Sequence, residues 1–338
     1  MIKSDIEDIM RWYYSSNTRL AVNIIQDIIL IDCQVIIDRR NNVVTGKTFI
    51  LDQLAKHYQG QQIIVVATDG EDLQFSGWDN FLKWCCATLS IPHNTITYVT
   101  HPNHTIDQDL QVNQLVVDLG IFRSANRHLP IIQKDLSQAK FIGYTIGRFT
   151  MPRMRLAYEL DKAFANDSYC EFSEVITNDN DNLCTWEYFA DNYTEELEWF
   201  KTKQFVPQHL DWHAGLWEYS LKQYDQIWNR YCIEVVVETN SLTNYFFTEK
   251  TARCLASGKP FVLFSGRNSL KNLQKMGFHT YEYVIDESYD TALHPYQRAQ
   301  MMVQALMDLY QSSNREDQIK ELYHIANENV KLFKEYYE

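Results

Sequence analysis

Composition sets the outer limits on what this chain can be. Its 338 residues are 45% hydrophobic and 22% charged, which is typical of a globular protein long enough for two domains and excludes a disordered chain. Its 31 basic and 44 acidic side chains leave a net charge of −13, which argues against a protein that coats nucleic acid by bulk electrostatics. The seven cysteines are odd in number and lack Cys-x-x-Cys spacing, so they predict neither a disulfide framework nor a zinc knuckle.

The first half of the chain alternates helix and strand patterns. Hydrophobic spacing predicts, in order, a helix over 2–14, strands within 28–37, a helix over 48–58, a strand over 63–67, a helix over 79–89, a strand over 96–100 and a helical region over 110–121. This alternation is typical of parallel βαβ units, so we expect a first α/β domain over 1–139. Acidic residues at 1–8, and the interruption of the apolar run 20–37 by Asp27 and Asp32, predict no targeting peptide, no membrane partner and a cytoplasmic protein.

The pattern restarts at a strand over 140–146, where we place the start of a second α/β domain, 140–295. Its predicted elements are a helix beginning near Pro152, a strand over 169–176, an aromatic helical insertion over 186–231, a strand over 233–237, a helix over 251–257, a strand over 261–264, a helix from 268 or 269 to 276 and a strand over 280–285. Two amphipathic helices, 295–310 and 317–337, complete the chain. The aromatic rings of the insertion suit either helical core packing or stacking on sugar rings.

Three arginines lie where the helix after strand 140–146 begins. Arg148, Arg153 and Arg155 carry forked donors that bind phosphate oxygens in pairs, so they suit a diphosphate. The alternative is that they are solvated or paired with Glu159 and Asp161, and Arg155 is the strongest candidate for a structural role.

The segment from Glu238 to Lys250 joins a strand to a helix at what should be the carboxyl end of a parallel sheet. Ligands bind at that edge because helix N-termini direct N–H groups and partial positive charge into it. Lys250 adds a full positive charge there, and Glu238 and Glu249 have the paired acceptors that grip two neighbouring ribose hydroxyls. The alternative is an ordinary first helical turn with a favourable Glu and a solvated Lys.

This region resembles the donor-binding half of GT-B glycosyltransferases, especially the fucosyltransferase and exostosin-like groups. The resemblance spans 231–290, and the matching residues are Glu238, Asn240, Thr248, Glu249, Lys250, Gly258, Pro260 and 261–264. One departure is Thr239, which separates Glu238 from Asn240 where fucosyltransferases usually have the two adjacent. That departure leaves the sugar and the nucleotide open.

The resemblance implies an α/β protein of two Rossmann-like domains, GT-B-like, with parallel sheets facing across a cleft and residues 296–338 packing back on the first domain. It implies transfer of a sugar from a nucleotide-diphosphate sugar, the donor substrate, to an acceptor hydroxyl, without a metal or other cofactor. The acceptor is a glycan or another hydroxyl compound, with a modified DNA base still open. The implied donor-binding residues are Arg148, Arg153, Glu238, Asn240, Thr248, Glu249 and Lys250.

A glycosyltransferase also needs a base to take the acceptor proton, and we expect it at a strand end of the first domain. Glu71 and Asp72 follow strand 63–67 and rank first, and His101 follows strand 96–100 and ranks next, whereas Asp69 suits a turn. A methyltransferase or dehydrogenase is disfavoured because no Gly-x-Gly-x-x-Gly turn is present. A non-catalytic carbohydrate- or nucleotide-binding protein with the same fold is the alternative to an enzyme.

Overall fold

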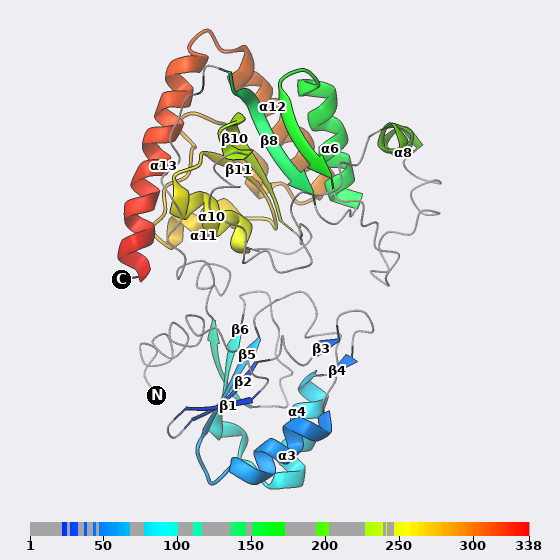
Figure 1. Ribbon diagram of the computed structural model, residues 1–338, viewed down its shortest axis with the longest axis vertical. Helices are drawn as coiled ribbons and strands as arrows, with labels where there is room; N and C mark the ends of the chain where they lie inside the picture. Colours follow the sequence, from blue (N-terminus) through cyan, green and yellow to red (C-terminus); the bar gives the residue numbers. More distant parts are fainter. Residues whose placement is uncertain are drawn as a thin grey trace. The chain divides into compact units, whose positions relative to one another are not determined.

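The computed structural model forms two compact units, Met1–Asn126 and Arg127–Glu338 (Figure 1). It describes residues 22–25, 28–32, 37–38, 43–44, 47–67, 78–100, 111–116, 136, 138–146, 151–172, 194–202, 227–238, 241 and 247–337. No helix within these ranges is long and apolar enough to cross a membrane.

The first unit is built on a sheet with strand order β1-β2-β5-β6-β7. Its strands are β1 (Val22–Ile25), β2 (Ile28–Asp32), β5 (Gln62–Ala67), β6 (Ile96–Thr100) and β7 (Asn113–Val116), beside a separate pair formed by β3 (Ile37–Asp38) and β4 (Val43–Val44). Strand β1 is antiparallel to β2, and the other neighbours are parallel. Parallel neighbours need long crossover connections, and two of these contain described helices, one between β2 and β5 (47–57) and one between β5 and β6 (78–89).

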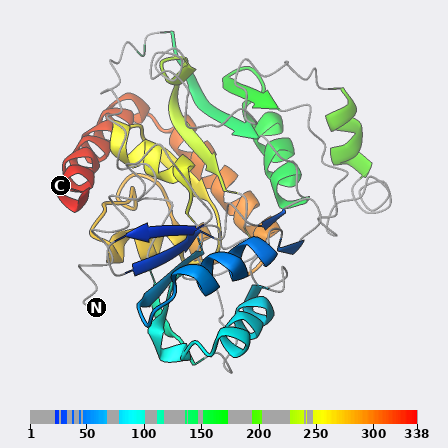
Figure 2. The ribbon, with the colours of Figure 1, turned by 60° about the horizontal axis from the view of Figure 1, so that its bottom comes forward.

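Two helices pack side by side against this sheet, α3 (Lys47–His57) and α4 (Trp78–Leu89) (Figure 2). They enclose one apolar core with the strands, in which Ile63 and Trp78 are fully buried. Burying one such aliphatic side chain contributes about 1.5–3 kcal/mol, so the alternating apolar positions of the strands hold this layer together. The short 3-10 helix η1 (His93–Thr95) leads into β6.

The predicted helix over 110–121 is wrong, because the described part of that segment is strand β7, Asn113–Val116. It pairs in parallel with β6, with Thr97 opposite Asn113 and Thr100 opposite Val116. An apolar run as short as 115–117 fits either a helix or a strand, and here the edge of β6 favours the strand.

The second unit is a four-stranded sheet with all neighbours parallel, in the order β11-β10-β8-β9. Its strands are β8 (Lys140–Ile146), β9 (Ser168–Phe172), β10 (Tyr231–Val237) and β11 (Phe261–Phe264). Every residue of β10 is buried, as expected for a central strand covered on both faces. The prediction of an α/β chain with parallel sheets is therefore confirmed, and their facing across a cleft stays a prediction.

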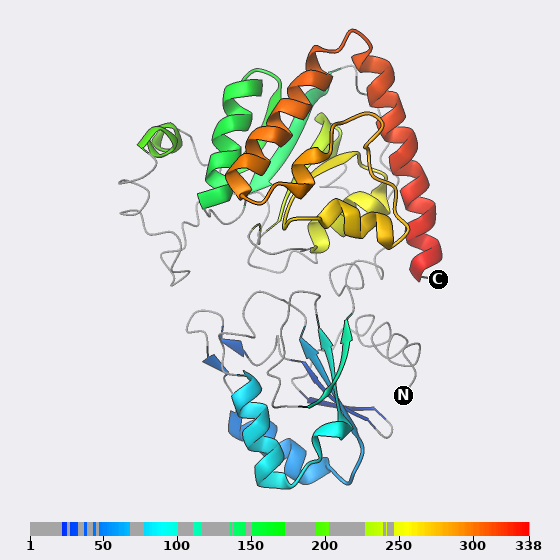
Figure 3. The same ribbon diagram turned by 180° about the vertical axis from the view of Figure 1, so that it is seen from behind.

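Helices cover both faces of this sheet. They are α6 (Met151–Phe164), α8 (Thr194–Lys201), α10 (Glu249–Ser257), α11 (Ser269–Lys275), α12 (Pro295–Gln311) and α13 (Arg315–Tyr337), with the 3-10 helix η3 (Ser288–Thr291). Helices α6 and α12 pack together on one face, and α10 packs with α13 on the other (Figures 1 and 3). The expected contact of residues 296–338 with the first domain stays a prediction.

Gly258 ends α10 in the left-handed conformation, with φ +71°, and its N–H bonds to Cys254 O at 3.1 Å. A Cβ at this position would lie 2.8 Å from Asn327 Oδ1 and 3.1 Å from Val330 Cγ2 of α13. Glycine is thus required twice, once by the backbone and once by the close approach of α13. The C-cap predicted from the sequence at Gly258 is confirmed.

The predicted strand over 280–285 is wrong, because these residues form turns instead. Val284 N bonds to Tyr281 O at 2.9 Å, and Tyr281 N bonds to the Glu287 carboxylate at 2.7 Å. The Tyr281 ring packs edge-on against Phe261, with 5.5 Å between ring centroids. Tyr281 and Ile285 are therefore buried by a turn rather than by a fifth strand, whereas Tyr283 is exposed.

Candidate functional site

The sheet of the second unit changes winding direction between β8 and β10. The chain passes from β8 to β9 on one side and then returns to place β10 on the other. Loops diverge at the carboxyl ends of two such strands, which makes that edge the usual ligand-binding crevice of a parallel sheet. Because β8 ends at Ile146 and β10 at Val237, the residues that follow these positions are the first candidates for a site.

Helix α10 begins at this edge with a capped turn. Thr248 has extended backbone angles, φ −131° and ψ −170°, and its hydroxyl oxygen accepts a hydrogen bond from Lys250 N at 3.3 Å. Threonine is favoured at such a position because its side chain satisfies an N–H group that has no partner within the helix. The positive end of the helix dipole therefore lies beside the end of β10.

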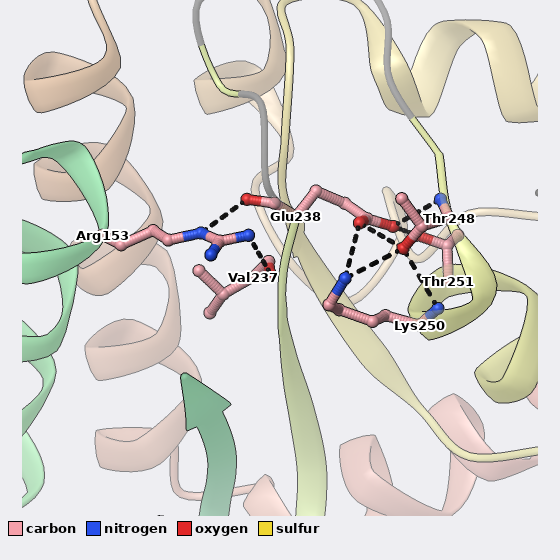
Figure 4. A network of polar contacts seen from close by, with 6 residues as sticks. All are labelled: Arg153, Val237, Glu238, Thr248, Lys250 and Thr251. Carbon is pink, nitrogen blue, oxygen red and sulfur yellow. Dashed lines mark hydrogen bonds and ion pairs between the residues drawn. The ribbon is translucent and has the colours of Figure 1, made fainter. Parts of the chain in front are cut away.

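Glu238 ties the end of β10 to the start of α10 (Figure 4). It is fully buried, and its Oε1 accepts bonds from Thr248 N at 2.8 Å and Thr251 Oγ1 at 2.7 Å. Its Oε2 accepts a bond from Thr248 Oγ1 at 2.6 Å. A charged acceptor makes each of these bonds stronger than a neutral one, so this carboxylate closes the intervening loop.

Lys250 folds back over the same turn. Its Nζ lies 3.1 Å from Thr248 Oγ1 and 3.6 Å from Glu238 Oε2, and 18% of its side chain is exposed. A partly buried ammonium group at a helix N-terminus raises the local positive potential, which suits an anionic ligand. The sequence expectation of a cation at this turn is thus realised with a specific geometry.

Two buried arginines hold the carboxyl edge of the sheet. Arg153 of α6 is 3% exposed, and it donates from Nε to Glu238 O at 2.9 Å and from Nη2 to Val237 O at 3.4 Å (Figure 4). Arg298 of α12 is 1% exposed and donates to the carbonyl oxygens of Ser241 and Ser265, the former at 2.9 Å. The described bonds of Arg153 go to backbone carbonyls, so its expected contact with a phosphate stays a prediction.

Arg155 pairs with carboxylates rather than with backbone carbonyls. It forms ion pairs with Glu159 one helical turn away and with Glu196 of α8. The interpretation of Arg155 as a structural residue, with Glu159 as a partner, is therefore confirmed.

A small pocket lies beside the charged turn, between β10, the end of β8 and α10. Its volume is about 20 Å³, and its lining residues are Thr145, Ile227, Trp228, Tyr231, Glu234, Val236, Val237, Lys250, Arg253 and Cys254. The most unusual of these is Glu234, a carboxyl group in the middle of a buried strand. Burial raises the pKa of Glu234 to about 7, although the Tyr231 hydroxyl and the Lys259 ammonium favour its charged form.

The structure brings Glu238, Thr248 and Lys250 together, with Glu249 as the first residue of α10 and Arg153 at the end of β10. The other expected site residues, Glu71, Asp72, His101, Arg148 and Asn240, lie outside the described residues. Sequence reasoning missed Thr251, Glu234, Arg253, Lys259 and Arg298. Only Glu234 carried a signal, because a charged residue inside an otherwise apolar strand is rarely buried without a partner.

The fold and site define an α/β protein with a doubly wound parallel sheet and a charged turn at its switch point. No family model and no curated protein matches the chain. The crystal structure of alpha,alpha-trehalose 6-phosphate synthase from Burkholderia multivorans is similar, with 11% sequence identity, a TM-score of 0.40, and coverage of 86% of this chain and 72% of that one. A likeness this distant transfers neither substrate nor activity.

Proposed function

We propose that this protein is a glycosyltransferase that moves a sugar from a nucleotide-diphosphate sugar to an acceptor hydroxyl. The observation that supports it best is Lys250 at the capped N-terminus of α10, next to the switch point of a parallel sheet. A helix N-terminus and an adjacent ammonium group are the features that bind a diphosphate. The sequence resemblance to donor-binding halves falls on the same turn.

In this proposal Lys250, together with Arg148 and Arg153, stabilises the diphosphate as it leaves the sugar. A preorganised cation aimed at developing negative charge lowers a barrier by about 3 kcal/mol. Asn240, Thr248 and Glu249 contact the nucleotide. Further residues hold the turn in shape rather than meet the ligand.

Glu238 is the chief of these positioning residues. Both of its carboxylate oxygens accept hydrogen bonds within the turn. We therefore propose that Glu249, rather than Glu238, binds the ribose hydroxyls. The burial of Glu238 supports the same assignment.

In this proposal the first unit supplies the base that activates the acceptor. We propose Glu71 or Asp72, and next His101, as the base that takes the proton of an acceptor hydroxyl. The acceptor is a glycan or another hydroxyl compound, including a modified DNA base. The donor is a substrate, and no metal or other cofactor takes part in this scheme.

The first test is calorimetric titration of the protein with a panel of nucleoside diphosphates and nucleotide sugars. Lys250→Ala should abolish binding of the one nucleotide that the wild type selects, because the ammonium group at the turn is lost. Lys275→Ala, which removes the same charge from an exposed position in the last turn of α11, should bind like the wild type. Absence of binding by every panel member refutes the proposal.

A transfer assay separates the enzyme from the binding protein. The protein that binds a nucleotide sugar should release nucleoside diphosphate in the presence of acceptor glycans, at a rate that Lys250→Ala lowers at least about 100-fold. Tight and selective binding without release on any acceptor favours the non-catalytic carbohydrate- or nucleotide-binding protein.

A further inference from the structure

The pocket beside the charged turn has one cationic wall and one acidic floor. Lys250 and Arg253 lie three residues apart on α10, so they share one side of the helix, and both line the pocket. Thr145 at the end of β8 lines it from the sheet. A volume of about 20 Å³ gives room for one small group rather than a whole nucleotide.

The floor is built around the carboxyl group of Glu234. The Tyr231 hydroxyl donates a hydrogen bond to Glu234 Oε2. The Tyr231 ring lies over Gly143 of β8, where a Cβ would come within 2.3 Å of ring atoms, and it stacks on Tyr169 with 5.7 Å between centroids. Glycine at position 143 thus creates the space that brings this phenol under the pocket.

Charged groups from β9, from α10 and from the residues after α10 act on Glu234. Lys259, fully buried after α10, holds its Nζ 4.3 Å from the Tyr231 ring centroid and donates to Trp228 O at 2.7 Å. Lys259 and Arg253 lower the pKa of Glu234, and Glu171 of β9 raises it. Lys250 lines the same pocket, and the Cys254 thiol interacts electrostatically with Glu234.

This arrangement is nearly balanced between a charged and a neutral Glu234. Burial opposes the negative charge, while the two cations and the phenol favour it. A negative charge brought to the Lys250 and Arg253 wall adds a repulsion that the bare pocket does not contain. Proton uptake by the carboxylate removes that repulsion, and the Tyr231 hydroxyl can still donate to the remaining carbonyl oxygen.

We propose that this pocket binds one phosphate-class anionic group together with one proton, which Glu234 takes up from solvent as the anion settles against Lys250 and Arg253. That the anion belongs to a diphosphate rests on the function proposed above. Proton uptake makes donor binding stronger at lower pH, independently of the protonation state of the ligand.

Inorganic diphosphate is the probe that tests this inference. Calorimetric titrations from pH 6 to 8, in two buffers of different ionisation enthalpy, give the affinity and the number of protons exchanged. If only protonated Glu234 permits binding, the affinity of the wild type relative to E234Q falls by up to about tenfold from pH 6 to 8. At pH 7.5 the wild type should take up about 0.8 of a proton more than E234Q.

Glu287→Gln is the matched control, because burial also raises the pKa of Glu287 to about 7 although that residue does not line the pocket. Its pH dependence of diphosphate binding should equal that of the wild type. A second measurement that does not depend on E234Q folding is carboxyl NMR on 13C-glutamate-labelled E287Q protein. The carboxyl that titrates near pH 7 should titrate at least one pH unit higher with saturating diphosphate.

The outcomes separate this inference from the proposed function. Binding of diphosphate with the same proton count and pH profile in wild type and E234Q overturns the proton coupling and leaves the donor site standing. A carboxyl pKa that stays unchanged in saturating diphosphate likewise overturns the proton coupling and leaves the donor site standing. Absence of diphosphate binding throughout pH 6 to 8 overturns both.

Discussion

Replacing Glu238 by alanine should lower the free energy of unfolding more than any other single substitution at the candidate site. The substitution removes the acceptor of bonds from Thr248 N, Thr248 Oγ1 and Thr251 Oγ1, and all of these donors lie in or next to the first turn of α10. A hydrogen bond to a charged group contributes about 1.5–3 kcal/mol, so three of them sum to about 4–9 kcal/mol. Water that enters the cavity recovers part of this, and we expect a loss of about 4 kcal/mol.

Urea unfolding followed by circular dichroism measures this loss as a change in the free energy of unfolding. Glu238→Gln keeps one carbonyl oxygen for the bonds at Oε1 but loses the ion pair with Lys250, so it should cost only about 1–2 kcal/mol. Glu321→Ala, at an exposed position of α13, should stay within about 0.5 kcal/mol of the wild type. A loss below about 1 kcal/mol for Glu238→Ala would refute the view that this buried carboxylate anchors the turn.

Three further predictions follow from buried or crowded positions. Gly143→Ala should lower the free energy of unfolding by about 1–3 kcal/mol, because its Cβ would meet the Tyr231 ring at 2.3 Å; denaturant titration showing no loss contradicts this packing. Gly258→Ala should cost at least about 1 kcal/mol more than Gly277→Ala, since both have positive φ but only Gly258 meets α13; equal losses contradict the close approach. Glu234→Gln should gain stability relative to the wild type as pH rises. The folded-state pKa of Glu234 is raised from 4.5 to about 7, so its stabilising contribution is full below pH 4.5 and is lost as pH rises to 7, by about 3 kcal/mol. Unfolding titrations at pH 5 and 8 that show the same difference between the two proteins contradict this.

Local rules predicted the elements around the candidate site well. The β-branched run 235–237 marks a buried strand, and Thr248 and Gly258 mark the two ends of α10, because capping depends on residues close in sequence. The errors fell where a distant partner decides the outcome. Segment 110–121 contains a strand because β6 offers an edge to pair with, and 280–285 forms turns because the Glu287 carboxylate accepts the N–H of Tyr281.

The same contrast between features set by nearby residues and features set by distant partners applies to the charged residues. The sequence places Lys250 in the first turn of a helix. The residues next to Glu238 in the sequence do not show that its carboxylate accepts hydrogen bonds from that turn. Arg153 and Arg155 are two positions apart on one helix. One is buried on backbone carbonyls and the other pairs with Glu159 and Glu196, because they project from the helix in different directions.

The sequence by itself therefore determined an α/β chain of parallel strands, the capped helix α10 and a cation at its start, since these follow from hydrophobic period and from capping. Only the tertiary structure decided that β8 and β10 flank the switch point and that Glu234 meets Tyr231 beneath Lys250 and Arg253. Strand order depends on which faces and edges bury each other across the whole sheet. Tyr231 and Glu234 are three residues apart on one strand, yet the space for their contact comes from Gly143 of the neighbouring strand, and such a fit between strands leaves no periodic trace in the sequence.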